Sequence, residues 1–197
     1  GVGIGAPLED YDVAPAPREG RGARFEDHLR TLRELFKGES LIEGVRAIGP
    51  SPVREGGPEI LLGATGKKAL ARTGEFTDGV TTWSFSADAV ETRAMFDVAE
   101  ESWRVAGRSG RPRLVCGCYF SAGPTAEEDL ARYFREYYPH VLPGQVEKLL
   151  AAVRTTTPQA IQDTVSEFRD IGCDEFIFVP VATKRAHLDH LSEIVGF

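Results

Sequence analysis

The turn Gly63-Ala64-Thr65-Gly66 has the residue types and the position best suited to chemistry in this chain. It follows an apolar run, Ile60 to Leu62, and leads into helix-forming residues that end at Asp78-Gly79. A turn of small residues between a strand and a helix exposes backbone N–H groups, and the helix dipole adds positive potential there. The turn is therefore a candidate cradle for a phosphate group. The alternative is a structural turn in which Thr65 caps the helix.

A second candidate lies in the next expected strand, residues 79–84. Trp83 stands just inside the C-terminal end of this strand, where an aromatic ring could line a pocket for a flat cofactor or a substrate. Thr82 and Ser84 alternate with it and offer hydroxyl groups, although only one face of a strand can point into such a pocket. We therefore count Thr82 and Trp83 with the turn as candidate cofactor-binding residues. The alternative for Trp83 is simple packing between the sheet and a helix.

The histidines and cysteines indicate no metal site. His187 and His190 are three residues apart on an expected helix, so a metal pair is geometrically possible, but no further ligand completes it and we expect a solvated face. The three cysteines, Cys116, Cys118 and Cys173, have no framework spacing, which favours reduced thiols in the cytoplasm. Cys116 and Cys118 would share one face of a buried strand as core thiols.

The sequence assigns no catalytic acid or base. It contains no Gly-x-Ser-x-Gly elbow, no Walker loop and no zinc-ligand spacing. Among 197 residues, 42% are hydrophobic and 27% are charged, which is ordinary for a globular domain. The net charge of −7 argues against nucleic acid as a partner, because phosphate neutralisation needs a basic surface. No apolar run approaches the length of roughly 20 residues that spans a bilayer, so we expect no membrane partner.

The periodicity predicts an alternation of strands and helices. The expected strands are residues 1–5, 59–63, 79–84, 113–120 and 175–181. The first expected helix is 20–37, with an apolar stripe at Phe25, Leu29, Leu32 and Phe36. A second helix is capped by Ser86 and ends at Gly107. Two more run from Thr125 to near Pro139 and from Thr157 to Ile171. Residues 38–58 read as a long loop. This order is typical of a parallel α/β architecture.

Several stretches resemble the luciferase-like flavin oxidoreductases, the family of bacterial luciferase and of deazaflavin-dependent reductases. Members of this family carry the pattern Pro-Pro-Ile-hydrophobic-Ile-Gly-Gly-small-Gly, followed by a helix and then by Ala-Asp-Gly-Trp. The matching residues of this chain are Pro58, Ile60 to Gly63, Gly66, Ala69-Leu70, Arg72 and Asp78-Gly79. Ala64 replaces the second glycine, and Val80 replaces the tryptophan. Further similarity lies in Gly1 to Gly5, in Arg24 to Glu39, and in Phe168 to Glu175, in the order of the family.

The resemblance implies a (β/α)8 TIM barrel, of which this chain holds about the last five strand–helix units. Gly1 to Gly5 would match the fourth strand, so we interpret 1–197 as a single luciferase-like domain, the C-terminal portion of a longer barrel or a naturally shortened relative. A helical insertion at about 125–156 carries Tyr133, Phe134, Tyr137 and Tyr138. It could act as a lid or pocket wall, or pack on itself or against a second subunit.

The resemblance also implies an oxidoreductase that binds FMN or coenzyme F-420, a deazaflavin, and acts on a small organic substrate by hydride transfer or monooxygenation. The insertion favours the deazaflavin. We expect a homo-oligomer, in the form of a dimer. One alternative is a non-catalytic relative that serves as a ligand-binding or assembly module, since the first three units have no counterpart here. Another is an open-sheet phosphate-binding enzyme of an unrelated family.

Overall fold

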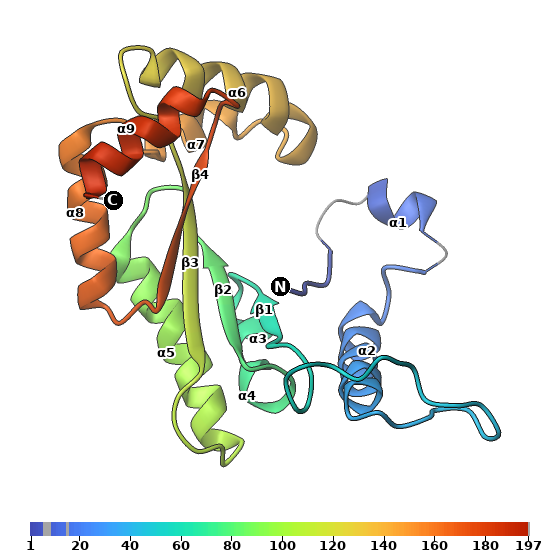
Figure 1. The fold of residues 1–197 in the computed structure, drawn as a ribbon. Coiled ribbons are helices and arrows are strands. Elements are labelled where there is room, and N and C mark those ends of the chain that lie inside the picture. Colours follow the sequence, from blue (N-terminus) through green and yellow to red (C-terminus); the bar gives the residue numbers. More distant parts are fainter. Residues whose placement is uncertain (6–8, 15, 197) are drawn as a thin grey trace. The chain divides into compact units, whose positions relative to one another are not determined.

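The computed structural model describes residues 1–5, 9–14 and 16–196. Its contacts divide the chain into two compact units, residues 1–80 with 98–113, and residues 81–97 with 114–197. Four strands form one sheet in the order β1-β2-β3-β4 (Figure 1). This sequential order with intervening helices is the parallel α/β arrangement that the sequence predicts.

The first unit is built on a long amphipathic helix. It contains α1 (Glu9–Val13), α2 (Arg21–Phe36), β1 (Leu61–Gly63), α3 (Lys67–Leu70), α4 (Thr73–Phe76), the start of β2 (Gly79–Trp83) and the second half of α5 (Ala89–Val105). The predicted apolar stripe of α2 is confirmed, since Leu29 is buried against Ile60 and Phe76 with Phe25, Leu32 and Phe36 around it. Residues 37–60 form the expected long loop, without helix or strand.

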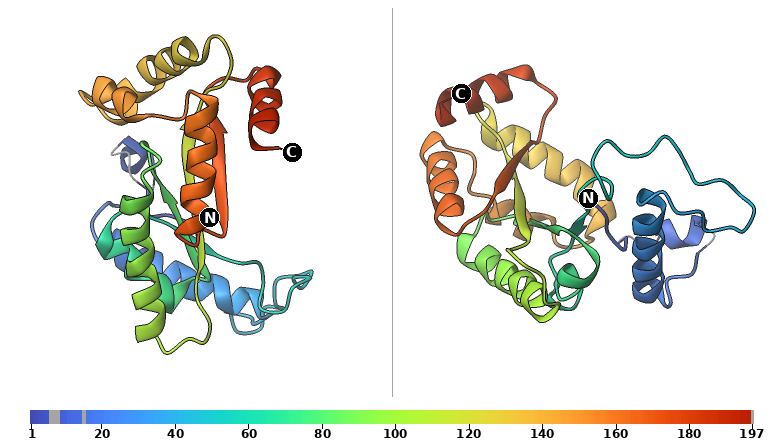
Figure 2. Two further views of the ribbon diagram at one scale, coloured as in Figure 1. Left: turned by 90° about the vertical axis from the view of Figure 1, so that its left-hand side faces the viewer. Right: turned by 60° about the horizontal axis from the view of Figure 1, so that its bottom comes forward.

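The second unit carries the other half of the sheet. It contains the end of β2, the first half of α5, β3 (Arg113–Phe120, from Leu114 on), α6 (Ala126–Val141), α7 (Val146–Ala152), α8 (Pro158–Asp170), β4 (Glu175–Pro180) and α9 (Arg185–Val195). β3 and β4 are parallel, with Val115 opposite Glu175 and Phe120 opposite Pro180. Figures 1 and 2 show α6 and α7 beyond the C-terminal ends of these two strands.

Alternate side chains of β3 serve different layers of the second unit. Phe120 packs with Ile161 of α8 and Leu191 of α9, in a cluster that includes Phe178 of β4. Tyr119 points to the opposite face, where it packs with Val179 and with the aromatic residues of α6. The helices α8 and α9 therefore cover one face of the β3–β4 pair, and α6 and α7 cover the C-terminal end of the other.

Two predicted elements are shorter in the structure than expected. The strand expected at residues 1–5 is reduced to a single parallel bridge between Val2 and Leu62, because β1 itself offers only three residues and Gly5 takes a positive φ of 76°. The helix expected after the turn is split into α3 and α4, of four residues each.

The predicted helix caps are partly confirmed. The Thr157 hydroxyl accepts from the Ala160 N–H, as expected for an N-cap. Helix α5 is capped by Asp88 and not by Ser86, since the Asp88 carboxylate accepts from the N–H groups of Val90 and Glu91. Thr125 does begin α6, but its hydroxyl donates to Asp129 instead of accepting a capping bond.

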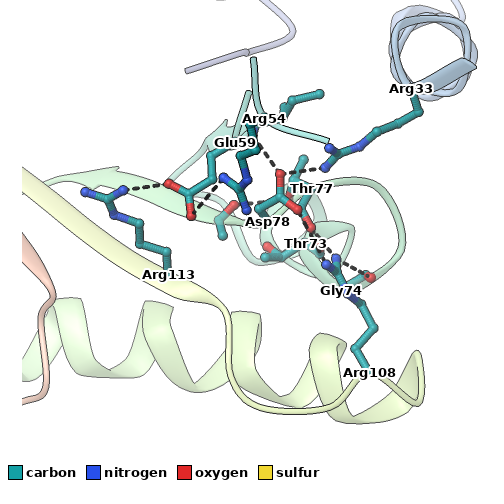
Figure 3. A network of polar contacts seen from close by, with 11 residues as sticks. Arg33, Arg54, Glu59, Thr73, Gly74, Thr77, Asp78, Arg108 and Arg113 are labelled. Carbon is teal, nitrogen blue, oxygen red and sulfur yellow. Dashed lines mark hydrogen bonds and ion pairs between the residues drawn. The ribbon is translucent and has the colours of Figure 1, made fainter. Parts of the chain in front are cut away.

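A polar network around Asp78 joins the elements of the first unit (Figure 3). The Asp78 carboxylate accepts from the Ile60 N–H at 2.8 Å and from Arg33 at 2.7 Å, with Arg108 at 3.5 Å. Burial alone would raise the pKa of Asp78, but these donors outweigh it and the pKa is lowered. Asp78 thus ties the end of the long loop and the start of β2 to α2, which is a structural role.

The start of β2 lies so close to β3 that only glycine fits. A Cβ atom built on Gly79 would lie 2.1 Å from the Arg113 carbonyl oxygen, far inside van der Waals contact. We expect Gly79→Ala to lower the free energy of unfolding by at least about 2 kcal/mol, as overpacking does in rigid cores. Urea unfolding measures this. Gly66→Ala is the matched control, because a Cβ there meets nothing within 4 Å, and equal losses in both variants would contradict the prediction.

No helix in the described ranges is both long and apolar enough to cross a membrane.

Candidate functional site

The turn 63–66 follows β1 and is mostly exposed, although the Gly63 N–H already donates to the Val2 carbonyl oxygen at 2.6 Å. Gly63 is the last residue of β1, and Thr65 and Gly66 are exposed. Gly66 has an ordinary extended conformation (φ −83°, ψ 133°) and open space around its Cα. Neither strain nor packing within the first unit therefore requires glycine at this position. A ligand that approaches the backbone closely would require it.

The positive potential at this turn comes from lysines more than from a helix. Gly66, and not Thr65, is the N-cap of α3, and no side chain caps this helix. Because α3 has only four residues, the dipole expected from a long helix is small. Lys67 and Lys68 follow the turn directly, and both are exposed. Neither lysine forms an ion pair within the described part of the chain, so both ammonium groups can face an anion.

Thr82 and Trp83 belong to opposite faces of β2. The Thr82 side chain is 3% exposed, and its hydroxyl donates to the Val115 carbonyl oxygen at 3.3 Å. The Trp83 ring lies against Tyr119, with ring centroids 4.7 Å apart, and against Phe85 at 6.1 Å. Gly117 of β3 makes room for the indole, since a Cβ at Gly117 would lie 3.0 Å from the ring. The binding role of Thr82 remains a prediction.

Trp83 and three tyrosines form an aromatic wall in the second unit, defined here as Trp83, Tyr119, Tyr133 and Tyr138. The Tyr119 hydroxyl accepts from Tyr133 at 3.2 Å and from Tyr138 at 3.0 Å. Burial raises the pKa of all three tyrosines, so the hydroxyls stay protonated at neutral pH. The helices α6 and α7 of the insertion pack on one another, and they place Tyr133 and Tyr138 against the strand ends. A role as a lid or pocket wall stays a prediction.

A buried Asp129–His187 pair was missed by the sequence reasoning. His187 is 2% exposed, so the expected solvated face is wrong for it, whereas His190 is half-buried. The His187 Nδ1 accepts from the Ala122 N–H at 3.3 Å, which leaves Nε2–H to donate to Asp129 Oδ2 at 3.2 Å. The available signal was position, since His187 continues the apolar stripe of Leu191 and Ile194 on α9.

Asp129 collects four donors, two from within α6 and α9 and two from the N-cap residues that precede these helices. Besides His187, its carboxylate contacts the Thr125 hydroxyl at 2.8 Å, Lys184 at 3.1 Å, and Arg132. The Thr125 hydroxyl and Arg132 hold the pKa of Asp129 well below its usual value of 3.8, although burial opposes them. Through Ala122 this cluster fixes the loop that follows β3.

The cysteines are free thiols. Cys116 and Cys118 are buried and face α5 and Thr155 respectively, which confirms them as core residues, and Cys173 is half-buried. Burial raises the pKa of Cys118 to about 12 and that of Cys173 to about 11, so neither is an activated nucleophile at neutral pH.

The fold and the site together define an α/β protein with parallel strands whose candidate binding groups lie at strand C-terminal ends, as in (β/α) barrels. The sequence model of the family described as luciferase-like monooxygenase matches residues 1–196. The chain therefore belongs to the luciferase-like monooxygenase family, as its motifs predict. No curated protein sequence matches the chain.

Solved structures of similar fold have low sequence identity. An F420-dependent secondary alcohol dehydrogenase, solved with an F420–acetone adduct, is 15% identical with a TM-score of 0.71, over 99% of this chain and 68% of that one. The monooxygenase RslO1 from Streptomyces bottropensis is 13% identical with a TM-score of 0.67, over 98% and 64%.

A coenzyme F420-dependent tetrahydromethanopterin reductase from Methanopyrus kandleri is 14% identical with a TM-score of 0.57, over 87% of this chain and 60% of that one. The chain thus spans about two thirds or less of the length of these three proteins. The likeness establishes the fold.

Proposed function

We propose that the protein is an oxidoreductase that binds FMN or coenzyme F-420 and acts on a small organic substrate. Family membership over residues 1–196 supports the reaction class. The proposal rests mainly on the turn 63–66. Nothing within the described protein requires glycine at position 66, and two lysines without ion-pair partners among the described residues follow it. In the finer form of the proposal, the chain forms the last five units of a (β/α)8 barrel within a homodimer.

The residues at hand fit the phosphate of such a cofactor. In the proposed complex, the backbone of Gly63 to Gly66 approaches the phosphate, and Lys67 and Lys68 balance its charge as point charges. Within the second unit, we propose Trp83 and Thr82 as further cofactor-binding residues, with the ring of Trp83 available for contact with a flat group and Thr82 holding the end of β2 through its bond to Val115. The cofactor, when bound, supplies the hydride, or the two electrons needed for monooxygenation.

The chain's own residues supply position and exclusion of water. Tyr133, Phe134 and Tyr138 of α6 lie against Tyr119 at the end of β3 and shield this end of the sheet from solvent. The described geometry offers no residue with the placement of a general acid or base, so orientation of substrate against cofactor is the protein's main contribution.

Direct binding of the two cofactors to the full-length protein tests the proposal. We expect one of them, with the deazaflavin favoured by the insertion at 125–156, to bind with a Kd at or below the micromolar range, as followed by quenching of its fluorescence. Riboflavin, which lacks the phosphate, is the matched control and should bind more weakly than FMN if FMN is the cofactor. Failure of both phosphorylated cofactors to bind would refute the proposed function.

A further inference from the structure

Two hydrogen-bond donors of the aromatic wall, the Trp83 indole N–H and the Tyr119 hydroxyl, lack an acceptor among the described residues. The Trp83 Nε1–H is buried and has no acceptor within the described part of the protein. The three tyrosine hydroxyls share only two hydrogen bonds, both accepted by Tyr119, so the hydrogen of the Tyr119 hydroxyl has no acceptor among them. An indole N–H can only donate. A buried donor without a partner destabilises the protein, and a ligand that supplies an acceptor recovers this free energy.

The face of the sheet that carries this wall is open in part. Trp83, Gly117, Tyr119 and Val179 share it by strand alternation. Ile177, two residues before Val179 on the same face of β4, is 41% exposed, and the side chains of Trp83 and Tyr133 are only half-buried. A molecule can therefore contact the rings from this face.

The chemistry of the wall selects one kind of ligand. Its members present ring edges and faces at interplanar angles of 56–82° around Tyr119, an arrangement that suits a flat ring inserted beside them. The polar groups of the four wall residues are N–H and O–H groups, and none of them is a carboxylate. The two donors without acceptors favour a ligand that offers a neutral or anionic oxygen as a hydrogen-bond acceptor.

We infer that the aromatic wall is a substrate subsite for a planar aromatic compound that carries a hydrogen-bond-accepting oxygen, such as an aryl ketone, held by Trp83 Nε1–H and the Tyr119 hydroxyl. The inference rests on the proposed function and names the substrate class of the same site. It assigns the indole N–H and the Tyr119 hydroxyl to the substrate.

A matched pair of probes tests this in the full-length protein: 2-acetylnaphthalene, which has the carbonyl acceptor, and 2-ethylnaphthalene, which has the same ring without it. Equilibrium dialysis should show the ketone bound at least about fivefold more tightly, the gain expected for one net hydrogen bond. Trp83→Phe keeps a ring and removes the N–H. In this variant, the ratio of the ketone's affinity to the affinity of 2-ethylnaphthalene should fall to within about twofold of unity. Tyr119→Phe should lower the ratio as well, and serves if Trp83→Phe does not fold.

The other tryptophan gives the control. Trp103 Nε1 already donates to the Ser109 carbonyl oxygen at 3.1 Å, so Trp103→Phe should leave the ratio unchanged. A ratio near one in the unaltered protein, or a ratio unaffected by Trp83→Phe, overturns the inference. So does a tenfold loss of cofactor affinity in Trp83→Phe with the ratio intact, because the N–H would then serve the cofactor. Absence of cofactor binding in the unaltered protein refutes the proposed function separately.

Discussion

Replacement of Gly66 by aspartate should weaken cofactor binding at least about tenfold, which corresponds to roughly 1.4 kcal/mol. Two effects act together if the turn 63–66 holds a phosphate. The new side chain occupies the open space that the ligand would use, and its negative charge repels the phosphate beside Lys67 and Lys68. The stability of the cofactor-free protein should change much less, because Gly66 is exposed and has an unstrained φ of −83°.

Fluorescence titration of the folded Gly66→Asp variant measures the loss, and Gly66→Ala and Gly66→Asn separate its causes. Alanine adds a single carbon with no charge, whereas asparagine adds nearly the volume of aspartate without its charge. If charge dominates, asparagine should retain most of the affinity that aspartate loses. Unchanged affinity in Gly66→Asp would show that the turn is structural, and the phosphate site would then have to be sought at Thr82 to Ser84.

The sequence predicted the sheet well because strand signals were local. Residues 79–83, 113–120 and 175–180 form strands within one or two residues of the expected limits, since each is a short apolar run between turn residues. The element at residues 1–5 was overestimated. A strand needs a partner of sufficient length, and β1 has only three residues to pair with it.

The site was harder to predict than the fold, because its polar groups depend on distant partners. Trp83 could be placed at a strand end from the sequence, but the tyrosine hydroxyls around it come from α6, and no local pattern shows that Tyr133 and Tyr138 point to Tyr119. His187 was misjudged for the same reason. Its charge partner Asp129 lies 58 residues earlier, so spacing on α9 alone suggested only a neighbour, His190.

Removing the charge of the buried Asp129 carboxylate should have a large effect on stability. Asp129→Asn keeps the shape of the side chain but removes the charge that faces His187, Lys184 and Arg132. Lys184 and Arg132 are about half exposed, so solvent screens them and they contribute little. The bond to buried His187 dominates, and the loss should amount to about 2–3 kcal/mol of unfolding free energy. Asp189→Asn on α9, exposed and 3.5 Å from Arg185, is the matched control and should cost under about 0.5 kcal/mol.

The pH dependence identifies the charge as the cause. The pKa of Asp129 is lowered in the folded protein, so its stabilisation is fully present above the pKa of the unfolded chain, near 3.9, and is lost as the pH falls below that value. Urea unfolding should therefore show a gap between the unaltered protein and Asp129→Asn that is constant from pH 7 to 5 and narrows by about 1 kcal/mol towards pH 3. A gap that stays the same at pH 3 would mean that Asp129 acts through shape and packing, and not through its charge.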